Sequence, residues 1–419
     1  MGVETAVQGQ TEGDKETAAP VRRPSVVSSK ERAAEAEEGT AGDDSDGPEE
    51  TYPEGGREAW LVVLGCWFGL TSSLGLMNTI ATFQTYVSTH QLAGRSPGEV
   101  GWVFSLYTFL SFFLGVYVGP LFDLYGPRWL VAAGTLCVFL GLMLLSISTG
   151  ESRASLSRLP LSRNLPGRSR RSVSRLTGPR AELWHFILSF GVLAGLGSAL
   201  LFTPCFAAVG HFFKRRRGLA TGIAATGSGL GGVVFPLLLQ ALFPRVGWAW
   251  AVRAVALVCL VLAGLANLLV RSRLAPAAGA SAHPDPRILR RVPFALTTLG
   301  TFLLEFGLFV PLGYVSLYAL ARGFGDAFSF QILAVLNSAS VVGRVLPGWY
   351  ADRVGAFNVN MLGVLVSVVA CLAVWLPAGG TTAGLVVFSV LFGFASGGNI
   401  SLTPVCIGQL CATNEYGRY

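Results

Sequence analysis

The sequence is poor in charged residues. Asp, Glu, Lys and Arg make up only 13% of its 419 residues, against roughly 25% in ordinary soluble domains. Histidine is scarce as well, and the four histidines show neither metal-ligand spacing nor a neighbouring nucleophile: His90, His185, His211 and His283. We therefore predict that the chain has no metal site, needs no cofactor and is not an enzyme.

A disulfide framework and a secretory signal peptide are also absent from the sequence. All seven cysteines lie in apolar runs or at their ends, where packing is the expected role. Residues 1–50 are rich in Glu, Ala, Gly, Ser and Asp and contain no apolar stretch of the kind found in signal peptides. Because such a composition cannot offset its ordering entropy, residues 1–55 are predicted to form a disordered acidic tail in the cytoplasm.

Long apolar runs, in contrast, are abundant. Hydrophobic residues make up 52% of the chain, and a run of about 20 residues crosses a hydrocarbon core of roughly 30 Å as a helix. Ten spans are predicted, at residues 60–86, 100–121, 129–149, 184–210, 218–241, 248–270, 293–318, 328–347, 358–377 and 383–406. The sequence thus predicts an all-α polytopic membrane protein whose main partner is the lipid bilayer.

The remaining charges are unevenly distributed along the chain. Residues 1–59 have a net charge of −9, and the rest of the chain has a net charge of +16. The basic residues lie in short loops, where they orient the protein in the membrane, so we expect no nucleic-acid partner. With the N-terminus in the cytoplasm, the inner loops hold 12 Lys or Arg and the outer loops hold three, if the eight arginines of residues 151–180 are left out.

One short motif occurs twice, each time between two apolar spans. The first copy runs from Gly119 to Arg128 around Asp123, and the second runs from Gly348 to Gly355 around Asp352. An acid and an arginine in a tight turn bounded by glycines indicate a gate, and the duplication predicts a membrane transporter built from two related halves. The predicted gate residues are Gly119, Asp123, Gly126, Arg128, Arg217, Gly348, Asp352, Arg353 and Gly355.

A second repeat indicates an insertion in the first half. Thr203-Pro204 recurs 200 residues later as Thr403-Pro404, whereas the two motif aspartates are 229 residues apart. The offsets agree if residues 151–180 are removed. This Arg- and Ser-rich stretch is either a retained intron or a genuine disordered outer loop, and both interpretations stay open.

The repeats divide the chain into two bundles. Residues 56–270 are predicted to form an N-terminal bundle of six helices, residues 271–292 a cytoplasmic linker, and residues 293–419 a C-terminal bundle of four helices. Two halves of six helices make twelve, so we predict that ten of an expected twelve transmembrane helices are present.

These features resemble the major facilitator superfamily and, more narrowly, the fungal branch of its monocarboxylate-transporter-like family. The resemblance covers residues 52–419 apart from the insertion. It implies two bundles that give alternating access to a site near the midplane. The narrower resemblance rests on Pro53–Gly56 before Trp60, Phe83–Tyr86, His211–Gly222 and Gly343-Arg344.

The resemblance also implies how the gate works. In the family, each gate aspartate holds the halves together on the cytoplasmic side against the N-terminus of a facing helix, a favourable place for an anion. Asp352 is expected to face the start of the fifth span, near Arg217 and Gly218. Asp123 is expected to face an eleventh span beyond Tyr419, so that in this chain it would lack a partner, the inner gate would not close and transport would be weak.

The chain departs from the family at two positions that matter for chemistry. Members that carry lactate-like acids with a proton use a lysine in helix 1 and an aspartate in helix 8. Those positions are Asn78 and Ser340 here, whereas the helix 8 arginine is kept as Arg344. The resemblance implies symport of protons with a small organic solute, and a monocarboxylate is one candidate despite the two departures.

Charged residues inside the spans are functional candidates because a charge at mid-bilayer is costly. Arg344 is predicted to bind an anionic substrate or to tie gate carbonyls or Asp352. Glu305 is predicted to carry the proton or to be a buried acid bonded to another helix. Arg253 is expected to reach the outer interface, with substrate binding as the alternative.

Polar residues in the spans complete the candidate pathway for solute and protons. Asn78, Asn337 and Tyr314 either line the cavity or bond one helix to another. The glycines between Gly218 and Gly232 are predicted to allow close helix packing.

The sequence therefore predicts a secondary transporter of a small organic solute, coupled to protons. The alternative is a membrane protein that does not transport, either a sensor or a truncated inactive relative. We expect the plasma membrane rather than the vacuole or another organelle.

Overall fold

The computed structural model describes residues 52–93, 95–148, 179–274 and 283–419. The predicted tail therefore lies outside the described residues except for its last residues, and so does almost all of the predicted insertion at 151–180. Within the described residues the regular structure is entirely helical. Nine of these helices are long and apolar enough to cross a membrane.

The first four predicted spans are helical, and each is built from one or more segments. The first span comprises α2 (Gly56–Met77) and α3 (Ile80–Thr89), and the second comprises α4 (Pro97–Phe113) and α5 (Gly115–Tyr125). The third is α6 (Pro127–Ile147), and the fourth runs through α9 (Pro179–Phe186), the π-helical η2 (Ile187–Ala194) and α10 (Gly195–Phe212).

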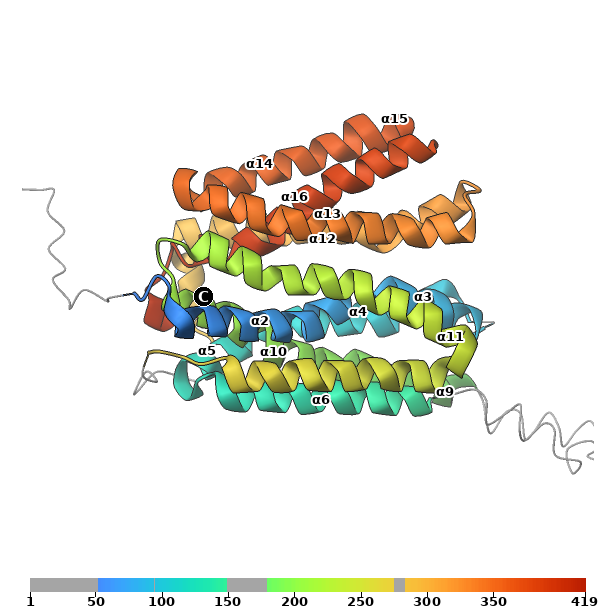
Figure 1. Cartoon of the computed structure of the whole chain (residues 1–419), viewed down its shortest axis with the longest axis horizontal. Coiled ribbons are helices and arrows are strands. Elements are labelled where there is room, and N and C mark those ends of the chain that lie inside the picture. Colours follow the sequence, from blue (N-terminus) through green and yellow to red (C-terminus); the bar gives the residue numbers. More distant parts are fainter. Residues whose placement is uncertain (1–51, 94, 149–178, 275–282) are drawn as a thin grey trace, which may run out of the picture. The chain divides into compact units, whose positions relative to one another are not determined.

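The fifth and sixth predicted spans are the two limbs of α11 (Arg217–Leu269), which has 53 residues. A straight helix of that length would measure about 80 Å, far more than a bilayer. The backbone leaves helical geometry at Gly247, where φ is 75° and ψ is 176°. Glycine adopts this left-handed φ readily, so the chain turns back there and the second limb returns alongside α6 (Figure 1).

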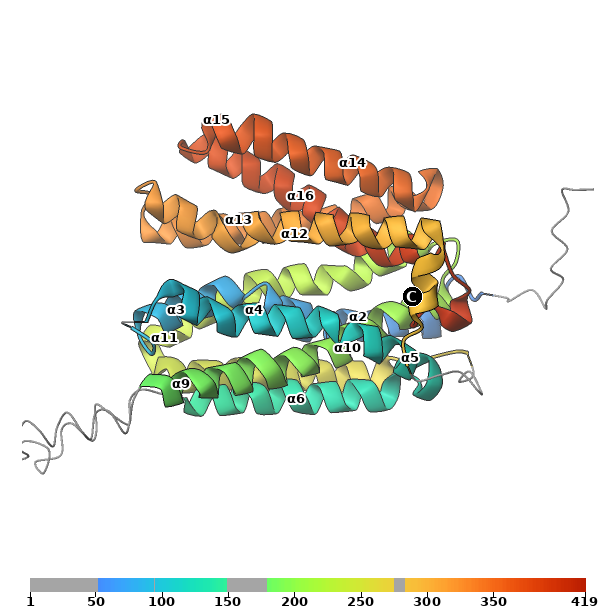
Figure 2. The same cartoon turned by 180° about the vertical axis from the view of Figure 1, so that it is seen from behind.

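The last four spans follow a short 3₁₀-helix, η3 (Pro286–Arg290). They are α12 (Val292–Ala321), α13 (Asp326–Val354), the continuous run of α14 (Ala356–Val369), η4 (Ala370–Trp375) and α15 (Leu376–Ala378), and α16 (Thr382–Ile407). The 3₁₀-helix η5 (Thr413–Glu415) lies just before the last described residues. Figure 2 shows α12 in front of α13 and α16. The four spans before α11, the two limbs of α11 and these last four spans account for the ten predicted spans.

The two copies of the gate motif differ from the predicted tight turns in one respect. Asp123 lies in the last turn of α5 and Asp352 in the last turn of α13, so both acids are helical. The helices end at the following glycines, Gly126 with φ of 74° and Gly355 with φ of 103°. Because a glycine at positive φ ends a helix without steric cost, only the second glycine of each copy forms the turn.

The helices pack so that the first limb of α11 lies between α2 and α13 (Figure 1). The buried apolar residues fall into a large group, which runs from α2 to the end of α11 and includes Tyr416, and two smaller groups from α12 to α16. Large apolar side chains are also exposed on the outside, such as Phe306 at 71% and Leu376 at 80%. Exposed apolar surface of this extent indicates contact with lipid.

Candidate functional site

Asp352 binds the N-terminus of α11. Its carboxylate accepts hydrogen bonds from the backbone N–H groups of Gly218, at 2.7 Å, and Leu219, at 2.9 Å. The first N–H groups of a helix have no partner within the helix, and the helix dipole favours an anion there. Gly218 also packs directly against Gly348, which leaves no room for a side chain on either residue. The contact expected between Asp352 and the start of this helix is therefore present.

Asp123 makes the equivalent contact near the C-terminal end of the chain. The N–H of Gly417 donates to its carboxylate at 3.1 Å, and Gly119 packs directly against Gly417. The expectation that Asp123 lacks a partner is thus wrong. Gly417 follows Gly218 by 199 residues, close to the repeat offset of 200, so the repeat itself pointed to this partner.

Arg217 connects the two contacts. Its buried guanidinium donates to three backbone carbonyls, those of Gly210 at 3.0 Å, Phe213 at 3.1 Å and Gly408 at 2.9 Å. Gly408 follows α16, whereas the other two lie at the end of α10. The guanidinium also lies 4.9 Å from the ring centroid of Tyr416. A single side chain at the start of α11 therefore joins the end of α10 to the residues that follow α16.

Tyr416 is held in turn by α16. Its hydroxyl donates to the carbonyl oxygen of Pro404 at 2.6 Å. Burial raises the pKa of this hydroxyl above its usual range, so the phenol stays protonated and keeps donating. The ring of Tyr416 also packs on Gly210, which fixes the adjacent Gly417 beneath Asp123.

Replacing Arg217 with glutamine should lower thermal stability markedly. The change removes charged hydrogen bonds to buried carbonyls, each worth about 1.5–3 kcal/mol, as well as the contact with Tyr416. We expect the unfolding temperature of the purified protein to fall by several degrees in a thermal scan. Arg216→Gln is the matched control because Arg216 is exposed, and an equal fall in both variants would contradict the structural role of Arg217.

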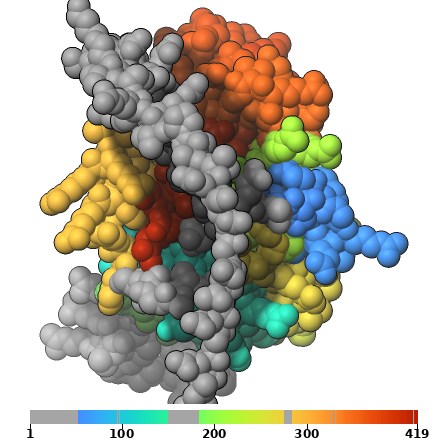
Figure 3. Space-filling model, turned by 90° about the vertical axis from the view of Figure 1, so that its left-hand side faces the viewer, coloured from blue at the N-terminus to red at the C-terminus, as the bar shows by residue number. Residues whose placement is uncertain are grey.

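These contacts lie at one end of the helices, which we call the Asp352 end and define by Asp123, Arg217 and Asp352. Both copies of the motif therefore lie on the same side, as a duplicated gate requires. Figure 3 views this end, with the C-terminal residues in dark red between the blue start of α2 and the gold residues around the start of α12. Arg128 and Arg353 are exposed there, and Arg353 stacks on Trp349 with 3.8 Å between guanidinium and ring centroid.

Glu54 is a contact residue of the Asp352 end that the sequence did not reveal as such. Its carboxylate accepts backbone N–H bonds from Lys214 at 2.9 Å, Arg215 at 2.6 Å and Arg216 at 3.2 Å. Its own N–H donates to the carbonyl oxygen of Phe212 at 3.2 Å. The loop between α10 and α11 is thereby shaped around this carboxylate.

Residues 52–55 are accordingly ordered, and the predicted disordered tail does not extend to residue 55. Tyr52 adds to the anchorage, because its hydroxyl is hydrogen-bonded to that of Thr413. The sequence signal was present in the Pro53–Gly56 motif, but only the folded loop shows what Glu54 binds.

Two of the predicted pathway residues meet at Gly232 on the first limb of α11. Asn78, at the end of α2, donates to the carbonyl oxygen of Ser228 at 3.1 Å. Asn337, on α13, donates to the carbonyl oxygen of Gly232 at 3.1 Å and is 3% exposed. A side chain at Gly232 would collide with both asparagines. The glycine thus lets α2 and α13 bring their amides to one point.

Arg344 lies two helical turns closer to the Asp352 end than Asn337. It is 1% exposed, and its Nη1 donates to the carbonyl oxygen of Ala225 at 2.8 Å. Gly222 and Gly229 pack against Arg344, so the predicted close packing through glycines occurs at this helix crossing. Nε of Arg344 has no hydrogen-bond partner within the part of the chain that the structure describes.

The other three pathway candidates lie apart from this crossing. Glu305 and Tyr314 are on α12, where Glu305 is partly buried and Tyr314 is 61% exposed. Arg253 is on the second limb of α11, donates to Ser146 Oγ at 3.2 Å and stacks on Trp250. The structure thus gathers Asn78, Asn337 and Arg344 along α11 and leaves these three elsewhere.

The described part of the chain contains no cluster of metal-ligating side chains. Among residues 52–93, 95–148, 179–274 and 283–419, no three His, Cys, Asp or Glu side chains come close enough to hold an ion. The arrangement offers backbone amides, two asparagines and a buried arginine, which suit helix contact and reversible hydrogen bonding with a small organic molecule.

Comparison of the sequence with known families gives one match that covers most of the chain. Residues 60–419 match the Major Facilitator Superfamily. Several similar curated proteins are fungal. They include an MFS transporter of Aspergillus flavus, 35% identical over 382 residues, which span 89% of this chain and 78% of that protein.

The names of two further relatives state what they transport. The fujikurins efflux protein of Gibberella fujikuroi is 34% identical over 88% of this chain and 74% of its own length. The riboflavin transporter MCH5 of Saccharomyces cerevisiae is 30% identical over 90% of this chain and 70% of its own length.

Solved structures show the same fold at low sequence identity. A bacterial homologue of the iron transporter ferroportin in the outward-facing state has a TM-score of 0.63 at 16% identity, covering 86% of this chain and 87% of that one. The transporter FucP in its outward conformation has a TM-score of 0.60 at 16% identity, covering 86% and 88%.

Proposed function

The chain belongs to the Major Facilitator Superfamily, and from that premise we propose that it moves a small organic solute by alternating access coupled to protons. It is an integral multi-pass membrane transporter rather than an enzyme. We further propose the monocarboxylate-transporter-like branch, supported by the Pro53–Gly56 motif and by Gly343-Arg344, and the plasma membrane as its location.

The observation that carries this proposal is the pair of aspartate contacts at the Asp352 end. Asp352 accepts from the N-terminus of α11, and Asp123 accepts from Gly417 beyond α16. Each contact joins one half of the duplicated chain to the other. Breaking both would let the halves separate at this end, which is the movement that alternating access requires.

For the solute, we propose a site along α11 between the two halves. Asn78 comes from the first half and Asn337 and Arg344 come from the second, and all three bond to carbonyls of α11. These bonds exchange readily for bonds to a solute that enters between the helices. The guanidinium of Arg344 suits a carboxylate, which supports a monocarboxylate as the first solute to test.

For the proton, we propose Glu305. It lies near the middle of α12 in a span with no other charged side chain within two turns on either side. No hydrogen bond to its carboxyl group is found within the described part of the chain. A carboxyl group in such a position changes charge state when its access to water changes, as a coupling residue must.

The test is uptake by the full chain in proteoliposomes. Labelled monocarboxylates and riboflavin are supplied with and without a pH gradient in which the outside is more acidic than the lumen. We expect this gradient to accelerate uptake of the transported solute severalfold. In the Glu305→Gln variant this stimulation should vanish while exchange of the solute across the membrane continues.

Glu99→Gln is the matched control for this experiment. Glu99 caps α4 and pairs with Arg95 at 3.3 Å, so its loss should leave the stimulation intact. Unchanged stimulation in Glu305→Gln would refute the coupling role. No uptake of any tested solute would instead favour the non-transporting membrane protein as the function.

A further inference from the structure

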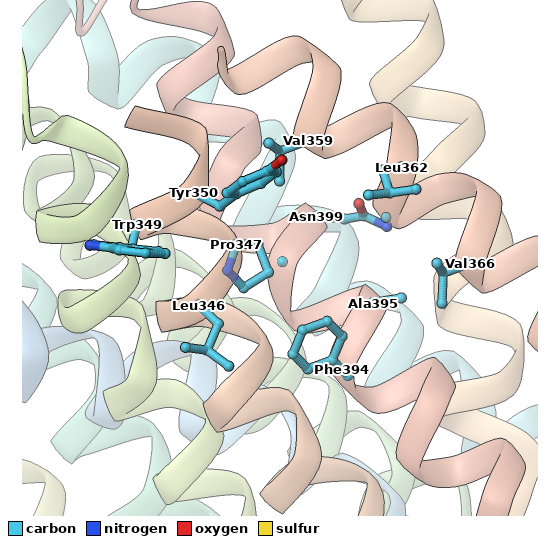
Figure 4. Close-up of a pocket in the computed structure, with 12 residues that line it drawn as sticks. Leu346, Pro347, Trp349, Tyr350, Val359, Leu362, Val366, Phe394, Ala395 and Asn399 are labelled. Atoms are coloured by element: carbon cyan, nitrogen blue, oxygen red, sulfur yellow. The ribbon is translucent and has the colours of Figure 1, made fainter. Parts of the chain in front are cut away.

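A cavity of about 320 Å³ lies within the C-terminal helices, away from the proposed solute site. It is bounded by α13, α14 and α16 (Figure 4). No residue of α2 or α11 lines it, and neither do Asn78, Asn337, Arg344 or Glu305. Its volume is within the range of small-molecule pockets, so it is a candidate site separate from the solute route.

The wall of this cavity is mostly apolar, and Asn399 is the only carboxamide among its twelve lining residues. Asn399, on α16, is fully buried, and its side chain borders the cavity (Figure 4). Neither Oδ1 nor Nδ2 of Asn399 has a hydrogen-bond partner within the described part of the chain. A buried carboxamide is normally paired, so a ligand that reaches Asn399 from the cavity would satisfy a donor and an acceptor that the described fold leaves unpaired.

The mouth of the cavity faces the outside of the helices. Leu346 is 52% exposed and Leu362 is 53% exposed, and both line the cavity within membrane-spanning helices. Two other lining residues are buried: Asn399 is 0% exposed and Ala395 is 2% exposed. A molecule dissolved in the bilayer could therefore enter without crossing the interface between the two halves.

The chemistry of the lining selects the head group of such a molecule. Lys, Arg, Asp, Glu and His are absent from the twelve lining residues. Arg353 stacks on the ring of Trp349 but does not itself line the cavity. An ion would therefore lose its hydration without compensation, which favours a neutral ligand.

We propose that this cavity binds an apolar molecule with a neutral carboxamide head, which pairs with Asn399. A second carboxamide donates its N–H to Oδ1 of Asn399 and accepts from Nδ2, so that both open atoms are satisfied at once. The apolar body then lies against Leu346, Phe394 and Val366 and leaves through the lipid-facing mouth. This site is independent of the proposed transport function, because its residues are not those of the solute route.

The test is photolabelling of the purified full chain in lipid nanodiscs. The probe is decanamide that carries a diazirine on its alkyl chain, and the labelled peptides are identified by mass spectrometry. We expect labelling within residues 346–350, 359–366 and 394–399. The N,N-dimethyl form of the probe has no N–H, and the matching carboxylate is charged at neutral pH, so both should label these peptides at least tenfold less.

Two variants locate the interaction. Asn399→Leu keeps the size of the side chain but removes its polar atoms, and it should reduce labelling by decanamide about tenfold. Asn360→Leu is the matched control, because Asn360 lies on α14 with its own buried, unpartnered Oδ1 but does not line the cavity.

The outcome is decided even where Asn399→Leu fails to fold, since the comparison of the three probes uses the unaltered chain. Equal labelling by decanamide and its dimethyl form would show a crevice that any lipid fills and would overturn the proposal. So would labelling by decanamide that is as strong in a folded Asn399→Leu variant as in the original chain.

Discussion

Replacing Asp352 with asparagine should open the Asp352 end and reduce solute uptake by at least tenfold. The carboxylate binds two N–H groups of α11, and a hydrogen bond to a charged group contributes about 1.5–3 kcal/mol. Asparagine is neutral and keeps one oxygen, so about 2 kcal/mol should be lost. Since 1.4 kcal/mol is a factor of ten in an equilibrium constant, the ratio of closed to open protein should fall about 30-fold.

Native cysteines report the opening directly. Cys406, on α16, is 1% exposed and packs in the small apolar group that includes Ala351 and Leu402 at this end. Its labelling by a water-soluble maleimide should rise in Asp352→Asn, as mapped by mass spectrometry. Cys259 is equally buried but lies on the second limb of α11, so its labelling should stay low and serve as the internal control.

Asp285→Asn is the matched control variant. Asp285 caps η3 through the N–H of Arg287 at 2.9 Å, so it has the same chemistry at an exposed site outside the gate. We expect it to leave both uptake and Cys406 labelling within twofold of the original chain. A gate role for Asp352 would be untenable if Asp352→Asn behaved in the same way.

The sequence predicted most of the helical arrangement, because apolar runs of this length have one stable form in lipid. All ten predicted spans are helical in the structure, with bounds that differ by a few residues. The reversal at Gly247 was predictable as a gap between two spans. What the runs could not show is that Asp123 and Asp352 remain helical, since helix ends depend on which glycine takes a positive φ.

The aspartate contacts of the proposed gate were predicted in part because the motif is duplicated. The repeat located both aspartates, and the family resemblance placed Asp352 at the start of α11. Gly417 lies one repeat offset beyond Gly218, but the prediction for Asp123 did not include it. The sequence could not predict that Arg217 binds three carbonyls and that Glu54 binds three N–H groups. Backbone groups have no sequence signature, so a side chain that binds them is recognised only once the chain is folded.

The pathway residues show the same limit. Composition identified the polar side chains within apolar spans, but it could not tell which helices lie next to each other. Asn78 and Asn337 converge because α2 and α13 both pack on α11. Arg253 was a candidate for the same reason, the cost of a charge inside a span. In the structure it lies away from this crossing and donates a hydrogen bond to Ser146 on α6.

Replacing Gly222 with valine should reduce the rate of uptake to below one-tenth of the original rate. Gly222 packs directly on the carbonyl oxygen of Arg344, so a side chain there would collide with the backbone of α13. Close approach of two helices through small residues cannot tolerate a branched side chain. The two helices would have to separate, which also pulls Asp352 away from the N–H groups of Gly218 and Leu219.

Gly264→Val separates this steric effect from a general cost of valine in α11. Gly264 lies on the second limb with nothing within 4 Å of where a side chain would begin, so uptake should stay within twofold. Gly222→Val should still be monodisperse on size exclusion, because the collision lies between the halves and leaves the packing of α2 on α11 unchanged. Cys406 should then become labelled as in Asp352→Asn, since either change separates α11 from α13 at the same end. Normal uptake in a folded Gly222→Val protein would mean that this helix crossing does not have to close during transport.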